Sequence, residues 1–165
     1  GLGSLKNGIP DVVISFHGNG QIKEEENFKE GKKEGFWRQW YKNGQKKMEG
    51  NYKDSDKTGI WTYWYENGQK KEEGNYEFGM EIGLWTYWYE NGQKKEEGNY
   101  NGKQDRREYL RVYGQKGGLW TYWYENGQKK TEGKYKDGKK DELWSTWDES
   151  GQKLLSERYE NGQKK

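Results

Sequence analysis

Residues 59–68 read Gly-Ile-Trp-Thr-Tyr-Trp-Tyr-Glu-Asn-Gly, and this stretch decides the fold. Aromatic and β-branched residues, which favour strands, fill its first part, and Asn67-Gly68 ends it. Asn-Gly between two extended segments is the strongest short-range signal of a β-hairpin, because a type I′ turn needs a positive φ at both central residues. A second extended run, Gln69 to Tyr76, closes at another turn around Phe78-Gly79. The stretch therefore predicts one hairpin of a larger antiparallel sheet.

The same hairpin recurs along the chain. Asn-Gly-Gln starts at Asn19, Asn43, Asn67, Asn91, Asn126 and Asn161, mostly 24 residues apart. The ten tryptophans form five Trp-x-x-Trp pairs: Trp37/Trp40, Trp61/Trp64, Trp85/Trp88, Trp120/Trp123 and Trp144/Trp147. With 25 glycines and a turn signal about every dozen residues, no room is left for helix pairs. The sequence predicts an all-β fold, an elongated antiparallel meander of tandem β-hairpin repeats of about 24 residues in a single-layer ribbon.

The turn residues fix a predicted register. They are Asn43, Gly44, Asn67, Gly68, Asn91, Gly92, Asn126 and Gly127. With two central turn residues, Trp61 pairs with Gly74, so that an indole can lie over bare backbone. One face of this hairpin would carry Trp61, Tyr63, Tyr65, Gly74 and Tyr76, and the other Ile60, Thr62, Trp64, Lys71 and Glu73. A three-residue loop with a glycine bulge would instead slip the pairing by one and exchange the faces.

The composition shows what must hold such a sheet together. Only 28% of the residues are hydrophobic and 35% are charged, whereas 17% are aromatic, so aromatic burial has to stabilise the fold. A net charge of +2 with interleaved signs argues against nucleic acid as a partner. The Lys-Lys-Glu-Glu runs at 70–73 and 94–97 are predicted to solvate the sheet while the lysine stems cover neighbouring rings.

The repeats suggest one repeat domain over residues 1–165. Residues 9–31 are predicted to form an N-terminal capping unit, 32–103 regular hairpin repeats, and 118–165 the remaining repeats with a C-terminal half-repeat. Between Asn91 and Asn126 the spacing is 35 residues, so 104–117 is an irregular insertion. We expect a loop excursion there; the alternative is an extra strand that reverses the turn parity. The natural chain is expected to extend beyond both ends.

The residue types that catalysis and metal binding need are scarce. His17 is the only histidine and there is no cysteine, which excludes His-paired nucleophiles and multi-His metal sites. Adjacent carboxylates on a strand point to opposite faces and cannot work as an acid–base pair. We therefore expect no catalytic residues, no cofactor and no metal. No apolar run is long enough to span a membrane.

The repeat resembles a known family. Gly-x-Trp-x-x-Trp-Tyr-x-Asn-Gly-Gln, followed by Gly-Asn-Tyr and a second glycine-containing turn, as in residues 59–79 and 83–102, looks like the bacterial variant of the MORN repeat. The resemblance implies a single-layered sheet of hairpins. Some bacterial members are regarded as antitoxins of toxin–antitoxin pairs and others as surface proteins, and MORN repeats have been credited with protein scaffolding and lipid binding.

The leading functional hypothesis is a non-enzymatic module for protein–protein interaction, antitoxin-like or binding a host surface. Exposed tryptophans are enriched at interface hot spots. The predicted partner-binding residues are the second tryptophan of each pair, Trp40, Trp64, Trp88, Trp123 and Trp147. One alternative is an array that binds cell-wall glycans or choline; another is a structural spacer that self-associates. The sequence predicts a soluble chain but does not decide whether it is cytoplasmic, secreted or at the cell surface.

Overall fold

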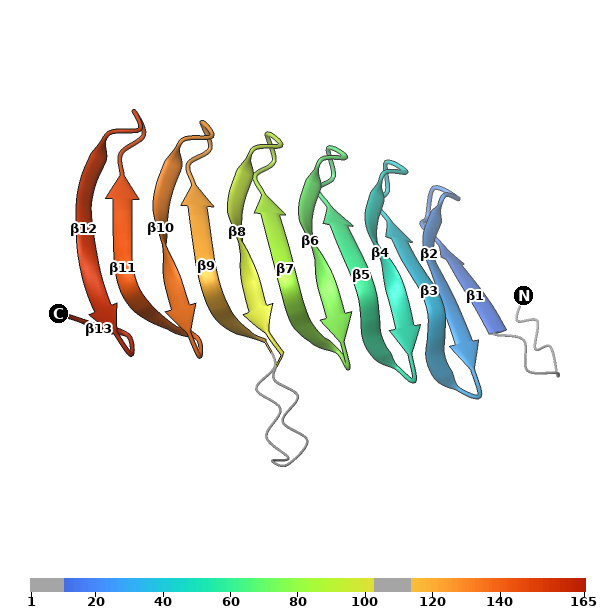
Figure 1. Ribbon diagram of the computed structural model, residues 1–165. Coiled ribbons are helices and arrows are strands. Elements are labelled where there is room, and N and C mark those ends of the chain that lie inside the picture. The colour runs from blue at the N-terminus through green and yellow to red at the C-terminus, as the bar shows by residue number, and fades with distance from the viewer. Residues whose placement is uncertain (1–10, 103–113) are drawn as a thin grey trace, which may run out of the picture. The chain divides into compact units, whose positions relative to one another are not determined.

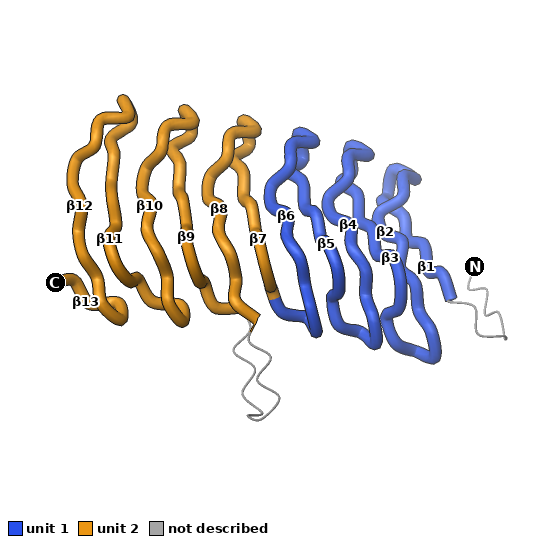
Figure 2. Tube along the Cα trace, in the orientation of Figure 1, with its two compact units in different colours: residues 1–80 blue, residues 81–165 orange. Residues whose placement is uncertain are grey.

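The computed structural model describes residues 11–102 and 114–165 and divides the chain into two compact units, Gly1–Met80 and Glu81–Lys165. Figure 1 shows the strands and Figure 2 shows the two units. Within each unit the strands are antiparallel and lie side by side in sequence order. The described residues contain strands and turns and no helix.

Unit 1 holds three hairpins. Its strands are β1 (Asp11–Phe16), β2 (Ile22–Lys29), β3 (Lys32–Trp40), β4 (Lys46–Lys53), β5 (Asp56–Trp64) and β6 (Lys70–Glu77). Each hairpin joins an odd-numbered strand to the next even-numbered one.

Unit 2 repeats the same arrangement. Its strands are β7 (Met80–Trp88, which begins one residue before the unit boundary), β8 (Lys94–Asn101), β9 (Gln115–Trp123), β10 (Lys129–Lys136), β11 (Lys139–Trp147), β12 (Lys153–Glu160) and β13 (Gln163–Lys164). The predicted all-β meander of tandem hairpins is confirmed.

The prediction of a type I′ turn at Asn-Gly-Gln is wrong. The Tyr65 amide donates to the Gln69 carbonyl and the Gly68 amide to the Tyr65 carbonyl, so the loop has three residues. Only its glycine takes the left-handed conformation, with φ 86° at Gly68. The two-residue turns with two positive φ values lie at the other hairpin ends instead, for example at Glu30-Gly31 and Asp137-Gly138. The last Asn-Gly, Asn161-Gly162, is also of this second kind.

A β-bulge restores the register that the longer loop would have shifted. Trp64 pairs with Lys70, but Tyr63 pairs with Glu72, so Lys71 is an extra residue in β6. Beyond the bulge, Trp61 pairs with Gly74 as predicted. The face predicted for Lys71 is wrong, because the bulge turns it toward the Tyr65 ring, with Nζ 6.0 Å from the ring centroid.

The glycines beneath Trp61, Trp120 and Trp144 lie on the preceding strand. A Cβ built on Gly98 of β8 would stand 2.3 Å from Trp120 Cδ2 of β9, and Trp120 pairs both with Gly98 and with Gly133 of β10. Gly50 beneath Trp61 and Gly133 beneath Trp144 repeat this arrangement. Bare backbone under the indole was predicted correctly, but the glycine belongs to the preceding hairpin and not to the same hairpin as the indole: Gly50, not Gly74, lies beneath Trp61.

The Asn-Gly-Gln turns stay at the same edge of the sheet despite the long spacing between Asn91 and Asn126. β8 pairs directly with β9, and Asn91 Nδ2 donates to the Glu125 carbonyl at 2.8 Å, so both turns lie at one edge. Of the predicted insertion 104–117, residues 115–117 begin β9. Residues 104–113 lie outside the described residues. The single domain over 1–165, the capping unit 9–31 and the other predicted boundaries stay predictions.

Candidate binding surfaces

One face of each unit carries the packed rings, and we call it the indole face. The first tryptophan of each pair is buried here: Trp37, Trp61, Trp85, Trp120 and Trp144 are at most 5% exposed. Tyrosines of the even strands separate successive indoles, so that the Tyr52 ring lies 4.9 Å from Trp37 and 5.0 Å from Trp61, centroid to centroid. The indole N–H groups of Trp61, Trp120 and Trp144 donate to backbone carbonyls, for example from Trp120 Nε1 to the Asn99 carbonyl at 3.1 Å, whereas Trp37 Nε1 donates to Glu24 Oε1 at 2.8 Å. This face is the core of the sheet.

Lysines cover these buried indoles. Nζ lies 3.5 Å from the Trp37 ring for Lys33, 4.5 Å from Trp61 for Lys57, 3.7 Å from Trp120 for Lys116 and 4.3 Å from Trp144 for Lys140. Such contacts fall well inside the range of cation–π attraction. Trp37, Trp61, Trp120 and Trp144 therefore already hold a cation of the chain itself. The lysines of the Lys-Lys-Glu-Glu runs lie farther from rings, with Nζ 6.0 Å from Tyr65 for Lys71 and 5.7 Å from Tyr89 for Lys95.

Tyrosine pairs run across the indole face beside the lysines. Tyr122 and Tyr135 lie 3.2 Å apart, oxygen to oxygen, and Lys116 Nζ donates to Tyr122 at 3.0 Å. Burial raises the pKa of Tyr122 to about 12 and is also the largest reason why the pKa of Tyr135 is raised. These phenols are therefore neutral and act as hydrogen-bonding groups at neutral pH.

The opposite face carries a row of large apolar side chains that the sequence analysis missed, and we call it the aliphatic face. The residue before each buried tryptophan is always large and apolar. These residues are Phe36 (54% exposed) and Ile60 (66%) in unit 1, and Leu84 (56%), Leu119 (52%) and Leu143 (52%) in unit 2. The signal was present in the sequence, since a strand with Trp at one position shows the preceding residue on its other face.

The predicted partner-binding tryptophans also lie on the aliphatic face. Trp40, Trp64, Trp88, Trp123 and Trp147 are half-buried. Lysines beside them are held in ion pairs: Lys46 Nζ lies 5.6 Å from the Trp64 ring and 2.7 Å from Glu49 Oε2. The pairs Lys70–Glu73, Lys94–Glu97 and Lys129–Glu132 repeat that contact. Burial alone would raise the pKa of Glu73, but hydrogen bonds from Lys70 and Thr62 hold it below its ordinary value. The aliphatic face is thus apolar in its middle and internally neutralised beside it.

Hydrogen bonds join successive hairpins at the Asn-Gly-Gln edge. Tyr41 donates to the Trp64 carbonyl at 2.8 Å, and Asn43 Nδ2 donates to the Glu66 carbonyl at 2.8 Å. His17 stands where later hairpins have tyrosine, and its Nε2 donates to the Trp40 carbonyl at 2.9 Å. The only histidine is therefore a structural group of the first hairpin.

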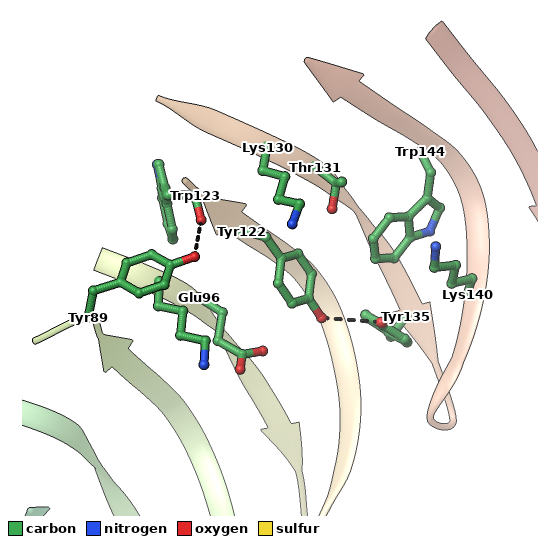
Figure 3. A pocket seen from close by; sticks show the side chains of 10 residues that line it. Tyr89, Glu96, Tyr122, Trp123, Lys130, Thr131, Tyr135, Lys140 and Trp144 are labelled. Atoms are coloured by element: carbon green, nitrogen blue, oxygen red, sulfur yellow. Dashed lines mark hydrogen bonds between the residues drawn. The ribbon is translucent and has the colours of Figure 1, made fainter. Parts of the chain in front are cut away.

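Each unit has one hollow of comparable position on the indole face. In unit 2 a hollow of about 330 Å³ lies between Tyr89, Tyr122 and Trp144 (Figure 3). It is lined by Tyr89, Lys95, Glu96, Tyr122, Trp123, Lys130, Thr131, Tyr135, Lys140 and Trp144. In unit 1 a hollow of about 370 Å³ is lined by His17, Lys23, Glu24, Gln39, Trp40, Tyr41, Lys42, Lys47 and Glu66. Several equivalent positions of the repeat line both hollows, for example Lys23 and Lys95, and Lys47 and Lys130.

Two further properties concern residues 11–102 and 114–165. Among them no cluster of three or more His, Cys, Asp or Glu side chains is placed to hold a metal ion. They also include no helix with the length and apolarity of a membrane-crossing segment.

Comparison with known proteins agrees with the hairpin unit. Residues 12–30, 33–54, 57–77, 81–101 and 116–137 match the sequence model of the MORN repeat variant, and together they make up more than half of the chain. Each matched segment contains one Asn-Gly-Gln loop and the strand after it. No curated protein matches the chain. This is a family of non-catalytic repeat modules, and the chain belongs to the MORN repeat variant family.

Proposed function

We propose that the chain is a protein-binding repeat module whose partner docks on the aliphatic face. The exposed residues Phe36 and Ile60 of unit 1, and Leu84, Leu119 and Leu143 of unit 2, each more than half exposed, support this proposal. Large apolar residues exposed on one face of a unit mark interaction sites, and an apolar centre with neutral polar surroundings is the usual anatomy of a protein interface. The half-buried tryptophans beside the row, Trp64 among them, supply the aromatic anchors expected of hot spots.

The alternative of a choline or glycan array finds less support. A choline cage needs an open aromatic face, and Lys33, Lys57, Lys116 and Lys140 already lie over four of the buried indoles. The tryptophans of the aliphatic face are half-buried among lysine stems, which leaves little flat surface for a sugar to stack on.

The experiment is quantitative affinity capture from the source cell on three immobilised chains. The first is the natural chain, the second carries Ile60→Ser, Leu84→Ser and Leu119→Ser, and the third carries Lys29→Ser, Lys53→Ser and Lys136→Ser as a matched control at exposed positions. A partner that docks on the row is enriched on the first and third chains and lost from the second, because each truncated contact is expected to weaken binding by about 1 kcal/mol or more.

The captured protein is then purified and titrated against the same three chains by calorimetry. Equal binding to the natural and the row-substituted chains, or capture of nothing that depends on the row, contradicts the proposal. Quenching of tryptophan fluorescence by choline at low concentration would favour the array instead.

A further inference from the structure

Five lysines share one unusual position in the sheet. Each is the extra residue of the β-bulge that follows an Asn-Gly-Gln loop, so the pairing skips it. In unit 1 they are Lys23, Lys47 and Lys71, and in unit 2 they are Lys95 and Lys130. Bulges re-aim a side chain and recur next to functional sites. We call these residues the bulge lysines.

The bulge turns these lysines to the indole face. Nζ lies 5.9 Å from the Tyr41 ring for Lys47, 5.7 Å from Tyr89 for Lys95 and 5.2 Å from Tyr124 for Lys130. These distances are near the outer limit of a cation–π contact, so the rings hold the ammonium groups only weakly.

The lysine that precedes each bulge lysine provides the contrast. Lys46, Lys70, Lys94 and Lys129 are all ion-paired on the other face, with Nζ–Oε2 distances of 2.6–2.8 Å. Within the described part of the chain, the bulge lysines make no ion pair. In each Lys-Lys pair, the first lysine is therefore neutralised by a glutamate, and the charge of the second, the bulge lysine, is left for an anion.

Four of the five bulge lysines line the two hollows, and Lys71 lines neither. The hollow of unit 2 contains Lys95, Lys130 and Lys140, and Glu96 is the one acid among its lining residues. That glutamate is occupied, since Lys116 Nζ lies 3.0 Å from its Oε2 (Figure 3 shows Glu96 beside Tyr122). In unit 1, Lys23 and Lys47 line the equivalent hollow. Each hollow therefore combines aromatic walls with a net positive charge.

We propose that the bulge lysines bind an extended acidic peptide whose carboxylates recur at every third residue. Equivalent residues of successive hairpins are two strands apart, which corresponds to about 9.6 Å. A polyproline II segment rises about 3.1 Å per residue, so side chains three residues apart are separated by about 9.3 Å. Such a peptide crosses the strands of one unit at right angles, with one carboxylate at each bulge lysine of that unit and its intervening residues against the tyrosines.

The charge pattern favours a peptide over other polyanions. A nucleic acid strand carries a charge about every 3.4 Å, three times denser than the lysines. The surplus phosphates would meet Glu24 and Glu96, which line the same hollows. A flat anionic membrane would not reach into a recess, and the net charge of +2 provides no long-range attraction to one.

The test uses the full chain and a fluorescent peptide of three Glu-Pro-Ser triplets, one for each bulge lysine of unit 1. A peptide of the same composition with its three glutamates adjacent serves as the periodicity control. Fluorescence anisotropy is measured at low salt for the natural chain, for Lys47→Gln with Lys71→Gln, and for Lys46→Gln with Lys70→Gln. The two double variants lose the same charge, one from the bulge positions and the other from the ion-paired positions. Lys47→Arg with Lys71→Arg restores the charge, and circular dichroism verifies each fold.

The proposal predicts that the periodic peptide binds several-fold more tightly than the clustered one. Loss of the two bulge lysines weakens binding about tenfold, since one exposed ion pair contributes up to about fivefold. Loss of Lys46 and Lys70 changes binding less than twofold, and the arginine variant binds like the natural chain. Equal weakening by both glutamine variants, equal binding of the two peptides, no binding, or preference for an oligonucleotide or anionic vesicles would overturn it.

This inference concerns the indole face and goes beyond the proposed function, which uses the aliphatic face. The peptide-binding experiment and the affinity-capture experiment can therefore fail independently of each other. Serine at Ile60, Leu84 and Leu119 leaves peptide binding unchanged, and glutamine at Lys47 and Lys71 leaves capture through the aliphatic row unchanged.

Discussion

At Gly98 the backbone carries no side chain, and the Trp120 indole fills the space where one would stand. The benefit is mutual, because the ring buries backbone that would otherwise face water while the strand supplies a flat support for the ring. The glycine is needed for space, since its φ is not in the left-handed region.

Gly98→Ala is therefore expected to destabilise the chain by about 1–3 kcal/mol, the usual cost of forcing extra volume into a packed site. Chemical denaturation followed by tryptophan fluorescence measures this. Gly18→Ala is the matched control, because nothing lies within 4 Å of a Cβ built there. If both substitutions shift the denaturation midpoint equally, Trp120 does not lie on Gly98.

Glu142 is the opposite case, a side chain where the backbone favours glycine. It takes φ 57° at the position where other repeats have Gly35, Gly59, Gly83 or Gly118. Its ion pair with Lys134 is more than half exposed on both sides and adds little.

Glu142→Gly should stabilise the chain by about 1 kcal/mol, because the left-handed conformation strains any residue with a Cβ. The urea midpoint is the measurement, with Glu149→Gly as the control at an exposed position outside the positive-φ set. A lower midpoint for Glu142→Gly would mean that its ion pair outweighs the strain.

At the scale of the element, the hairpin is held by edge hydrogen bonds as well as by rings. His17 of the first hairpin and Tyr41 of the second both donate to a carbonyl of the following hairpin. One ring N–H thus replaces one phenolic O–H at the same place.

His17→Tyr is expected to keep the stability of the natural chain within about 0.5 kcal/mol, whereas His17→Phe loses about 0.5–1.5 kcal/mol with the hydrogen bond. Thermal or urea unfolding compares the two variants. Indistinguishable midpoints would show that the bond to the Trp40 carbonyl contributes nothing.

Tyrosine pairs link neighbouring strands and make stability depend on alkaline pH. The pKa of Tyr122 is raised to about 12 by burial, so its phenol stays neutral in the folded state when it ionises in the unfolded state. A raised pKa means that its contribution is complete below pH 10, the unfolded value, and is lost as the pH rises toward 12.

The urea midpoint should therefore fall over this interval, and Tyr122→Phe should fall less steeply. Tyrosinate absorbance of the folded chain gives an independent reading. Ionisation of all tyrosines near their ordinary pKa would contradict the packing.

The pairing of the hairpin could be predicted from the sequence except at the β-bulge. Trp61 opposite Gly74 followed from the turn and the alternation of strand residues, and it is correct. The place of Lys71 was not predictable in the same way, because the three-residue loop and the bulge shift the register by compensating amounts. The two shifts cancel, so Trp61 pairs with Gly74 whether the loop has two residues or has three residues and a bulge. The sequence pattern therefore does not distinguish these two hairpins.

At the scale of the whole molecule, the repeat explains what the sequence could and could not predict. The fold class follows from a unit written several times, since each hairpin must place its rings beside those of the next. The position of the Trp61 indole over the preceding strand could not be predicted from the repeat. It depends on the bulge that forms at Gly59, between the residues of β5 that pair with β4. The aliphatic row could have been predicted from the sequence, because the residue before each buried tryptophan must lie on the opposite face of its strand.

The packing of the rings depends on one placement: the indoles of Trp61, Trp120 and Trp144 each lie over a glycine of the preceding strand. Proton chemical shifts of the glycines test it most directly, because protons above the face of an aromatic ring are shielded. The account predicts that the Hα signals of Gly50, Gly98 and Gly133 move strongly upfield, with cross-relaxation to Trp61, Trp120 and Trp144 respectively, while Gly18 keeps an ordinary shift. Ordinary shifts at all four glycines would contradict the account.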